Sequence, residues 1–108
     1  MFMRLIKLVS VIDAKEGSPL GITVEGFPPL AVYRVGDRYF VTDNLCTHGQ
    51  ALLNEGIQDG LVIECPFHGG RFNIETGEPI LFPCQIPLKT YEITLKDDFI
   101  YVAAPTPE

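Results

Sequence analysis

The sequence predicts an all-β domain, and three observations lead to that class. Ten glycines and nine prolines are many for 108 residues and indicate frequent turns. Helical periodicity is nearly absent, because glycine or proline interrupts almost every window in which an apolar stripe with i, i+3, i+4 spacing begins. Short runs of β-branched and apolar residues recur between the turns. Short strands at this spacing are typical of an antiparallel β-sandwich or a small barrel.

The expected elements of the N-terminal half begin with two strands and one hairpin. The strands are Met3–Val9 and Leu20–Val24, with one helical turn expected near Asp13–Glu16. The hairpin joins Leu30–Val35 to Arg38–Thr42, because a two-residue glycine-containing turn separates two runs with high β-propensity.

The C-terminal half predicts three further turns between strands. The first turn, Gln58-Asp59-Gly60, is expected between strands at Gly56–Ile57 and Leu61–Glu64. The second, Glu75-Thr76-Gly77, is expected after a strand at Arg71–Ile74. The third, Lys96-Asp97-Asp98, is expected between strands at Lys89–Leu95 and Phe99–Ala103. We see no internal repeat and no linker, so residues 1–108 are expected to form a single domain.

The charge and the apolar runs exclude two classes of partner. Fourteen acidic and eight basic residues give a net charge of −6, which argues against nucleic acid or an anionic membrane as a partner. No apolar run approaches the roughly 20 residues of a membrane span. The first eleven residues are interrupted by Arg4 and Lys7 and do not resemble a signal peptide, so we expect a cytoplasmic protein.

The chemistry-bearing residues gather in two short motifs. One is Cys46-Thr47-His48, followed by a glycine, and the other is Cys65-Pro66-Phe67-His68, followed by two glycines. Both histidines of the chain belong to these motifs. Each motif ends a strand-like run, so the hairpin between them can bring the two loops together.

Thiolate and imidazole together suit an iron–sulfur cluster, zinc or copper. The two cysteines and two histidines leave two possibilities open. All four could bind one tetrahedral zinc, or the cysteines could hold one iron of a [2Fe–2S] cluster and the histidines the other. Unrelated core residues are a poor explanation, because every histidine follows a cysteine on a glycine-bearing loop.

The two motifs resemble the cluster-binding loops of Rieske proteins. Cys-Thr-His-Gly at 46–49 and Cys-Pro-Phe-His-Gly at 65–69 carry the resemblance. Other segments are similar to the ferredoxin components of naphthalene- and biphenyl-type dioxygenase systems, and together they cover essentially the whole chain. These segments are Leu20–Gly26, Thr42–Leu45, Arg71–Asn73 and Pro87–Tyr91.

The resemblance implies a Rieske-type antiparallel β-sandwich with a small cluster-binding subdomain, at about residues 44–84, formed by the two loops. It implies that Cys46 and Cys65 ligate one iron of a single [2Fe–2S] cluster, and His48 and His68 the other. The protein would then be no enzyme itself. It would pass single electrons from an NAD(P)H-dependent flavoprotein reductase to the terminal oxygenase of an aromatic-ring dioxygenase.

Three alternatives remain from the sequence. The chain could be a zinc-bound structural or interaction module with the same four ligands, a Rieske ferredoxin serving another oxygenase, or a small subunit of an assimilatory nitrite reductase. Colour separates zinc from iron–sulfur, because only the latter absorbs visible light. Length argues against the oxygenase itself, because no histidine remains for a mononuclear iron site.

Several residues near the loops carry weaker expectations. Phe67 is expected to contact a docking partner, together with Gln50, Leu52 and Pro83, and Cys84 to be a small apolar thiol near the loops. Arg71 is expected to form a surface ion pair. We expect three acidic residues to be solvated charges: Asp43, Glu55 and Glu64.

The resemblance also bears on the reduction potential. Respiratory Rieske proteins carry a serine and a tyrosine that donate hydrogen bonds to the cluster sulfurs, and Gly70 and Phe72 stand at those positions here. Such donors stabilise the reduced cluster, so their absence lowers the potential. We therefore expect a value near the low end of the Rieske range, about −150 mV.

Overall fold

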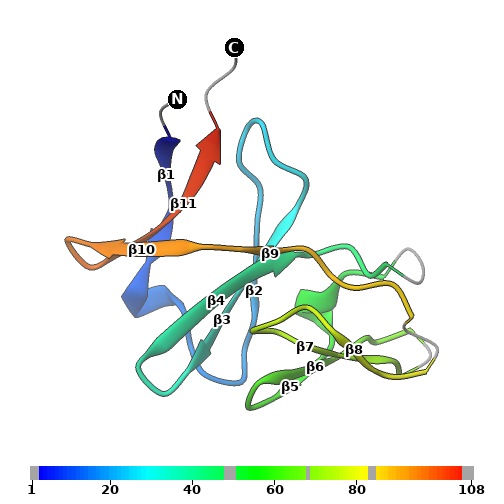
Figure 1. Cartoon of the computed structure of the whole chain (residues 1–108). Helices are drawn as coiled ribbons and strands as arrows, with labels where there is room; N and C mark the ends of the chain where they lie inside the picture. The colour runs from blue at the N-terminus through cyan, green and yellow to red at the C-terminus, as the bar shows by residue number, and fades with distance from the viewer. Residues whose placement is uncertain (1–2, 48–50, 68, 83–84, 106–108) are drawn as a thin grey trace.

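Three antiparallel sheets make up the computed structural model, which describes residues 3–47, 51–67, 69–82 and 85–105 (Figure 1). The strand orders are β1-β11-β10, β2-β3-β4-β9 and β5-β6-β7-β8. The predicted all-β class is confirmed. Among the described residues, no helix is long and apolar enough to cross a membrane.

The first sheet joins the two ends of the described chain. β1 (Met3–Ser10) pairs with β11 (Phe99–Pro105), which also pairs with β10 (Ile93–Lys96). Lys96 lies opposite Phe99, so the hairpin turn is the two-residue Asp97-Asp98 rather than the predicted three residues. Both turn residues have positive φ, 52° and 65°, which aspartate tolerates better than most residues.

The second sheet contains the predicted central hairpin. β3 (Leu30–Val35) and β4 (Arg38–Asp43) pair along their whole length, and β2 (Leu20–Ile22) and β9 (Thr90–Tyr91) flank them. The prediction of a single strand at 89–95 is therefore wrong. This segment forms two strands: β9 pairs with β4, and β10 pairs with β11, so the chain passes from one sheet to the other at Glu92.

The third sheet follows the first cysteine motif and contains the second. β5 (Ile57–Asp59), β6 (Val62–Glu64), β7 (Arg71–Asn73) and β8 (Pro79–Leu81) form a meander. The predicted turn at 58–60 is shifted, since Asp59 pairs with Val62 and the chain reverses at residues 60–61.

Gln58 explains that shift. Its side chain is buried, and its Nε2 donates hydrogen bonds to the carbonyl oxygens of Arg34, at 2.9 Å, and Gly60, at 3.1 Å. Gln58, which precedes the turn-favouring residues Asp59 and Gly60, is thus held in a strand by a contact with Arg34 of β3, 24 positions away in the chain.

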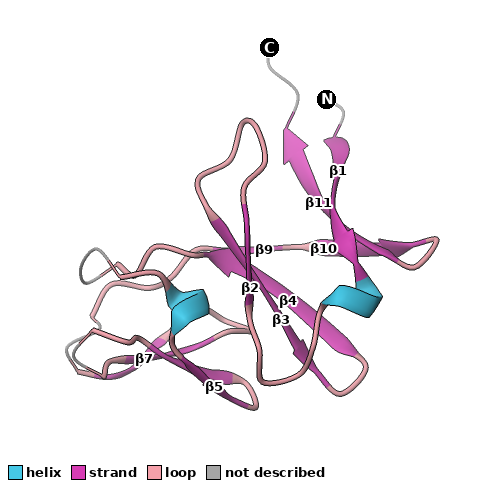
Figure 2. Ribbon diagram, turned by 180° about the vertical axis from the view of Figure 1, so that it is seen from behind, coloured by secondary structure: helices cyan, strands magenta, loops and turns pink. Residues whose placement is uncertain are grey.

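Two 3-10 helices complete the fold of the described part of the chain (Figure 2). The first, η1 (Val11–Asp13), begins before the predicted turn at 13–16, because Ser10 Oγ accepts a hydrogen bond from the amide of Ile12. The second, η2 (Leu53–Glu55), has no counterpart in the prediction. It packs its one buried residue, Leu53, into the core beside the cysteines.

β3 separates two hydrophobic cores. Its side chains alternate, so that Leu30 and Val32 pack toward the first sheet while Ala31 and Tyr33 pack toward the third. All four are almost fully buried. The members of the core on the side of the third sheet are Ala31, Tyr33, Cys46, Leu53, Ile63, Cys65, Phe72, Ile74 and Leu88. Both motif cysteines therefore belong to this second core.

Candidate metal centre

Two cysteine thiols from different loops meet inside the second core. Cys46 lies three residues after β4, and Cys65 directly follows β6. Each is only 2% exposed, and both are free thiols. Burial raises the pKa of the Cys65 thiol, and the neighbouring Cys46 raises it further. The two sulfurs are therefore close enough to influence each other, as two ligands of one metal centre must be.

Backbone hydrogen bonds close both loops beside these sulfurs. The amide of Cys46 donates to the carbonyl of Ala51 at 2.9 Å, and the amide of Cys65 to that of Gly70 at 2.7 Å. The amide of Phe67 points at the Cys65 sulfur, with an N···Sγ distance of 3.5 Å, and opposes the rise in its pKa. A backbone donor aimed at a thiolate stabilises its charged form, which is the form that binds a metal.

The two motif histidines, His48 and His68, lie outside the described residues, as do Gln50, Pro83 and Cys84. Their predicted roles therefore remain predictions. The donors that are described fit an iron–sulfur cluster: two buried, unbridged thiols, one from each loop, with an amide directed at one sulfur.

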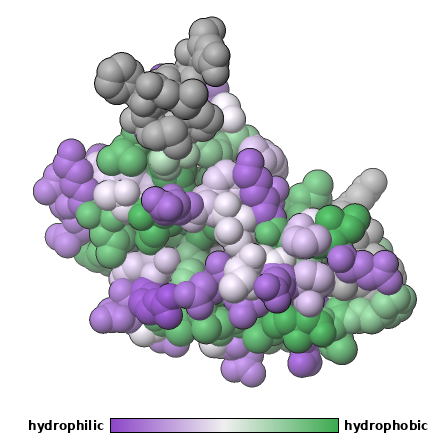
Figure 3. Space-filling view, in the orientation of Figure 1, coloured by the Kyte–Doolittle hydropathy of each residue, from purple (hydrophilic) through white to green (hydrophobic). Residues whose placement is uncertain are grey.

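A third segment lies beside the first loop. Thr47 Oγ1 donates a 2.8 Å hydrogen bond to the carbonyl of Ile86, and Leu88 packs into the same core as the cysteines. Large hydrophobic side chains nevertheless remain exposed in the segments around the two loops: Leu45, Phe67, Ile80, Leu81, Phe82 and Ile86. Figure 3 shows hydrophobic patches interleaved with hydrophilic residues over the lower part of the molecule, where Figure 1 places the third sheet. We call these six exposed side chains, which lie on the loops or near them in the chain, the apolar rim.

Asp43 and Arg71, two charged residues that flank the loops, form specific contacts with other side chains. Asp43 is half-buried and accepts a 2.6 Å hydrogen bond from the hydroxyl of Tyr91, so the expectation of a solvated charge is wrong for it. The ion pair predicted for Arg71 is confirmed, with Glu64 as its partner at 3.0 Å. Register explains the pair, because Glu64 and Arg71 face each other across β6 and β7.

An amide pair next to the first loop was missed by the sequence analysis. Asn44 is 3% exposed, and its side chain forms two hydrogen bonds with Asn54 of η2, each 2.8 Å long. The signal available in the sequence was weak, because asparagine in a loop ordinarily indicates a turn.

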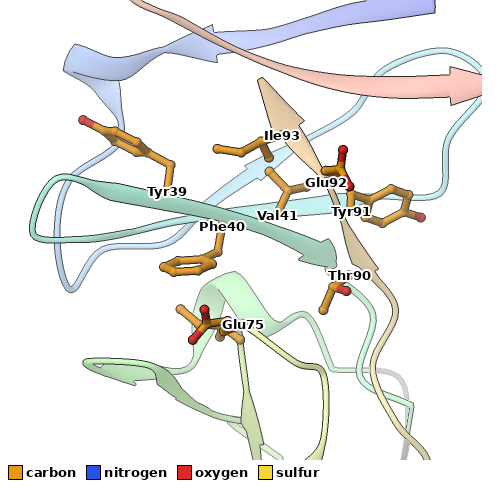
Figure 4. Close-up of a pocket in the computed structure, with 9 residues that line it drawn as sticks. Tyr39, Phe40, Val41, Glu75, Thr90, Tyr91, Glu92 and Ile93 are labelled. Atoms are coloured by element: carbon orange, nitrogen blue, oxygen red, sulfur yellow. The ribbon is translucent and has the colours of Figure 1, made fainter. Parts of the chain in front are cut away.

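A wide cleft of about 590 Å³ lies on another part of the molecule, between β4 and the β9–β10 segment (Figure 4). Tyr39 and Tyr91 mark its two ends, and Glu75 reaches it from the turn after β7. Glu75 is held by an ion pair with Arg38, at 2.6 Å. Neither Cys46 nor Cys65 lines this cleft, so it is separate from the candidate metal centre.

The chain belongs to the Rieske [2Fe–2S] domain family, whose model matches residues 4–92. Membership of this family identifies the cofactor as one [2Fe–2S] cluster of the Rieske type.

Within this family the chain is a Rieske ferredoxin, an electron-transfer protein and not itself an enzyme. It is 48% identical over 98 residues to ferredoxin CarAc of Metapseudomonas resinovorans, covering 91% of this chain and 92% of the relative. It is 42% identical to the ferredoxin component of the naphthalene 1,2-dioxygenase system of Pseudomonas putida, covering 90% and 92%.

Solved structures agree with this assignment. The ferredoxin of Sphingomonas yanoikuyae B1 superposes with a TM-score of 0.92 at 51% identity, over 94% of this chain and all of that one. A ferredoxin in complex with the oxygenase of carbazole 1,9a-dioxygenase gives 0.86 at 47% identity, over 92% of each chain. A nitrite reductase small subunit of Mycobacterium tuberculosis, at 16% identity and a TM-score of 0.83, shares the fold alone.

Proposed function

We propose that this chain carries single electrons from an NAD(P)H-dependent flavoprotein reductase to the terminal oxygenase of an aromatic-ring dioxygenase system. The observation that carries the proposal is the pair of buried thiols, Cys46 and Cys65, which come from two loops and pack in one core, with the exposed apolar rim nearby in the chain. A relative that matches over nine-tenths of the chain is the ferredoxin component of a naphthalene 1,2-dioxygenase system, and a ferredoxin 47% identical to this chain was solved in complex with the oxygenase of carbazole 1,9a-dioxygenase.

The proposal includes the four ligands. Cys46 and Cys65 would hold one iron, and His48 and His68 the other. When bound, the cluster takes up and releases one electron at a time. The protein residues exclude water from the cysteine sulfurs, direct the Phe67 amide at Cys65, and close each loop through its backbone hydrogen bonds.

Metal analysis of the purified protein tests the ligand set. We expect two irons and two acid-labile sulfides per chain with visible absorption, and a colourless protein for Cys46→Ser and for His68→Ala. Cys84→Ser is the control and should keep its colour, because Cys84 is not among the proposed ligands. Anaerobically purified protein that holds one zinc and no sulfide would overturn the electron-carrier function.

We place the carrier in the cytoplasm, where NAD(P)H is available to a flavoprotein reductase. Reconstitution tests the transfer itself: reductase, this protein and a ring-hydroxylating oxygenase should turn over NADH and aromatic substrate together. The same mixture without this protein, or with the Cys46→Ser variant, should form no product. Product formation at an unchanged rate without it would contradict the assigned role.

The apolar rim is the proposed docking surface for both partners. Phe67 lies in the second loop and is 59% exposed, and Phe82 directly follows β8 and is 74% exposed. Burying such side chains drives association, while the net charge of −6 directs the protein toward basic partner surfaces.

Substitution of these aromatic residues tests the docking surface. Phe67→Ser and Phe82→Ser should raise the KM of the reductase for the ferredoxin by about tenfold and leave iron content unchanged. Ile12→Ser is the matched control, because Ile12 is equally exposed, at 76%, but lies on η1 at the other side of the molecule (Figure 1). Equal effects of all three variants would exclude docking through the rim.

A further inference from the structure

Asn44 joins three segments through four hydrogen bonds. Its backbone amide donates to the carbonyl of Pro29 at 2.8 Å, and its carbonyl accepts from the amide of Leu53 at 2.7 Å. Its side-chain Oδ1 accepts from the amide of Asn54, and its Nδ2 donates to Oδ1 of Asn54, both at 2.8 Å. The side chain is only 3% exposed, so these bonds are shielded from competing water.

This amide pair stands at the base of the first cysteine loop. Asn44 is the first residue after β4 and precedes Cys46 by two positions, while Asn54 lies in η2 on the returning arm. Beyond the pair, Leu45 and Leu52 form an isolated bridge, and the Cys46 amide bonds to the opposite arm. From the base of the loop towards Cys46, the contacts therefore follow in order: the amide pair, the Leu45–Leu52 bridge and the hydrogen bond of the Cys46 amide.

β2 packs against the same pair from outside the loop. A Cβ at Gly21 would lie 3.1 Å from Cγ of Asn54 and 3.2 Å from Nδ2 of Asn44, closer than ordinary van der Waals contact. The absence of a side chain at Gly21 thus leaves room for the side-chain amides of Asn44 and Asn54. The pair connects the β2-β3-β4-β9 sheet to the segment that carries Cys46.

Hydrogen bonds hold the Cys46 segment in one orientation better than apolar packing does, because they fix direction as well as distance. Breaking one would leave a buried polar group without its partner, which costs more than the bond itself contributes. Groups that orient a metal ligand from outside the ligand shell control how tightly the metal is held.

We propose that the Asn44–Asn54 amide pair is a positioning device for Cys46, and that it sets how firmly the protein retains its cluster. The inference rests on the proposed ligand role of Cys46. It adds two positioning residues, neither of which is a ligand.

Three alanine and aspartate variants test the proposal against a matched control. Asn54→Ala removes one side-chain bond and Asn44→Ala removes both, whereas Asn54→Asp keeps the oxygen that accepts from Asn44. The control, Asn73→Ala, also removes two side-chain bonds, those to the amides of Glu75 and Thr76, but at the turn after β7.

The main readout is the half-life of the cluster's visible absorption in excess iron chelator, below the unfolding temperature. Asn44→Ala and Asn54→Ala should shorten it by about tenfold, as expected for residues that orient a ligand. Asn54→Asp and Asn73→Ala should stay within about twofold of wild type. Equal half-lives for Asn44→Ala and Asn73→Ala, at equal losses of unfolding free energy, would overturn the proposal.

A second readout does not depend on loss of the cluster. In the iron-loaded protein, hydrogen exchange at the amides of Cys46 and Leu53 should accelerate in Asn54→Ala and not in Asn73→Ala, and unchanged exchange would count against the proposal. Gly21→Ala, which presses a methyl group on the intact pair, should also shorten the cluster half-life if Asn44→Ala fails to fold. Wild-type protein without iron would defeat the proposed function, whereas iron-loaded variants with unaltered half-lives would defeat this inference alone.

Discussion

The hydroxyl of Tyr91 donates a 2.6 Å hydrogen bond to Oδ1 of Asp43, which joins residues 48 positions apart in the chain. Tyr91 lies on β9, and Asp43 is the last residue of β4, three positions before Cys46. The backbone reinforces the contact, because the Asp43 amide donates to the carbonyl of Lys89 at 2.9 Å. The strand that leaves the second sheet is thereby fixed to the strand that leads into the first cysteine loop.

Removal of this hydroxyl should cost stability. Tyr91→Phe leaves a half-buried carboxylate without its donor, so the free energy of unfolding should fall by about 1–2 kcal/mol. Chemical denaturation checks this, with Tyr101→Phe on β11 as the control. Equal midpoints for the two variants would show that the bond to Asp43 contributes nothing specific.

Tyr33 should make the protein sensitive to alkali. Its side chain is fully buried, its hydroxyl lies 2.9 Å from Thr42 Oγ1, and burial raises its pKa above the ordinary value of 10.0. A raised pKa in the folded state means that the unfolded state loses the proton first. Stability is therefore fully present below about pH 10 and falls as the pH rises further.

Denaturation curves between pH 8 and pH 11.5, about the range in which tyrosine ionises, test this dependence. Wild type should lose stability steeply above pH 10, and Tyr33→Phe should lose less over the same interval although it is less stable at pH 8. Parallel curves for the two proteins would assign the alkaline instability to other groups.

Gly77 should tolerate no side chain. Its φ is +81°, and a Cβ there would collide with the carbonyl oxygen of Leu88, whose amide bonds to the Gly77 carbonyl at 2.7 Å. Gly77→Ala should reduce the free energy of unfolding by about 3 kcal/mol or more. The matched control is Gly60→Ala, with φ +59° and open space around its Cβ, which should cost about 1 kcal/mol. Equal losses would show that conformation alone, not the collision, matters at Gly77.

The reduction potential should respond to new donors near the cysteines. Phe72 is fully buried in the same core as Cys46 and Cys65, and the carbonyl of Gly70 accepts the Cys65 amide. Phe72→Tyr combined with Gly70→Ser should raise the potential from about −150 mV toward zero.

Redox titration measures this shift directly. Phe99→Tyr, on β11 in the first sheet, is the control and should leave the potential unchanged. A double variant that retains its iron and shows no rise would refute the explanation of the low potential by missing donors.

Local signals in the sequence anticipated most strands but misplaced their ends. The hairpin at 30–42 could be predicted because glycine and aspartate in its turn agree with the strand pattern on either side. The turn at 58–60 was misplaced, because the local signal of Asp59-Gly60 does not show that Gln58 is held in β5 by the distant carbonyl of Arg34. The division of 89–95 between two sheets has no local signal at all.

The sequence by itself determined the all-β class, the family and the two cysteine motifs, because ligand types and their spacing are properties of the chain. Only the tertiary structure decided that the Cys46 and Cys65 thiols meet in one buried core, that Tyr91 holds Asp43, and that Asn44 and Asn54 pair beneath the first loop. The physical reason is that these relationships join segments whose separation is set by sheet pairing and core packing, and neither is encoded in a local residue pattern.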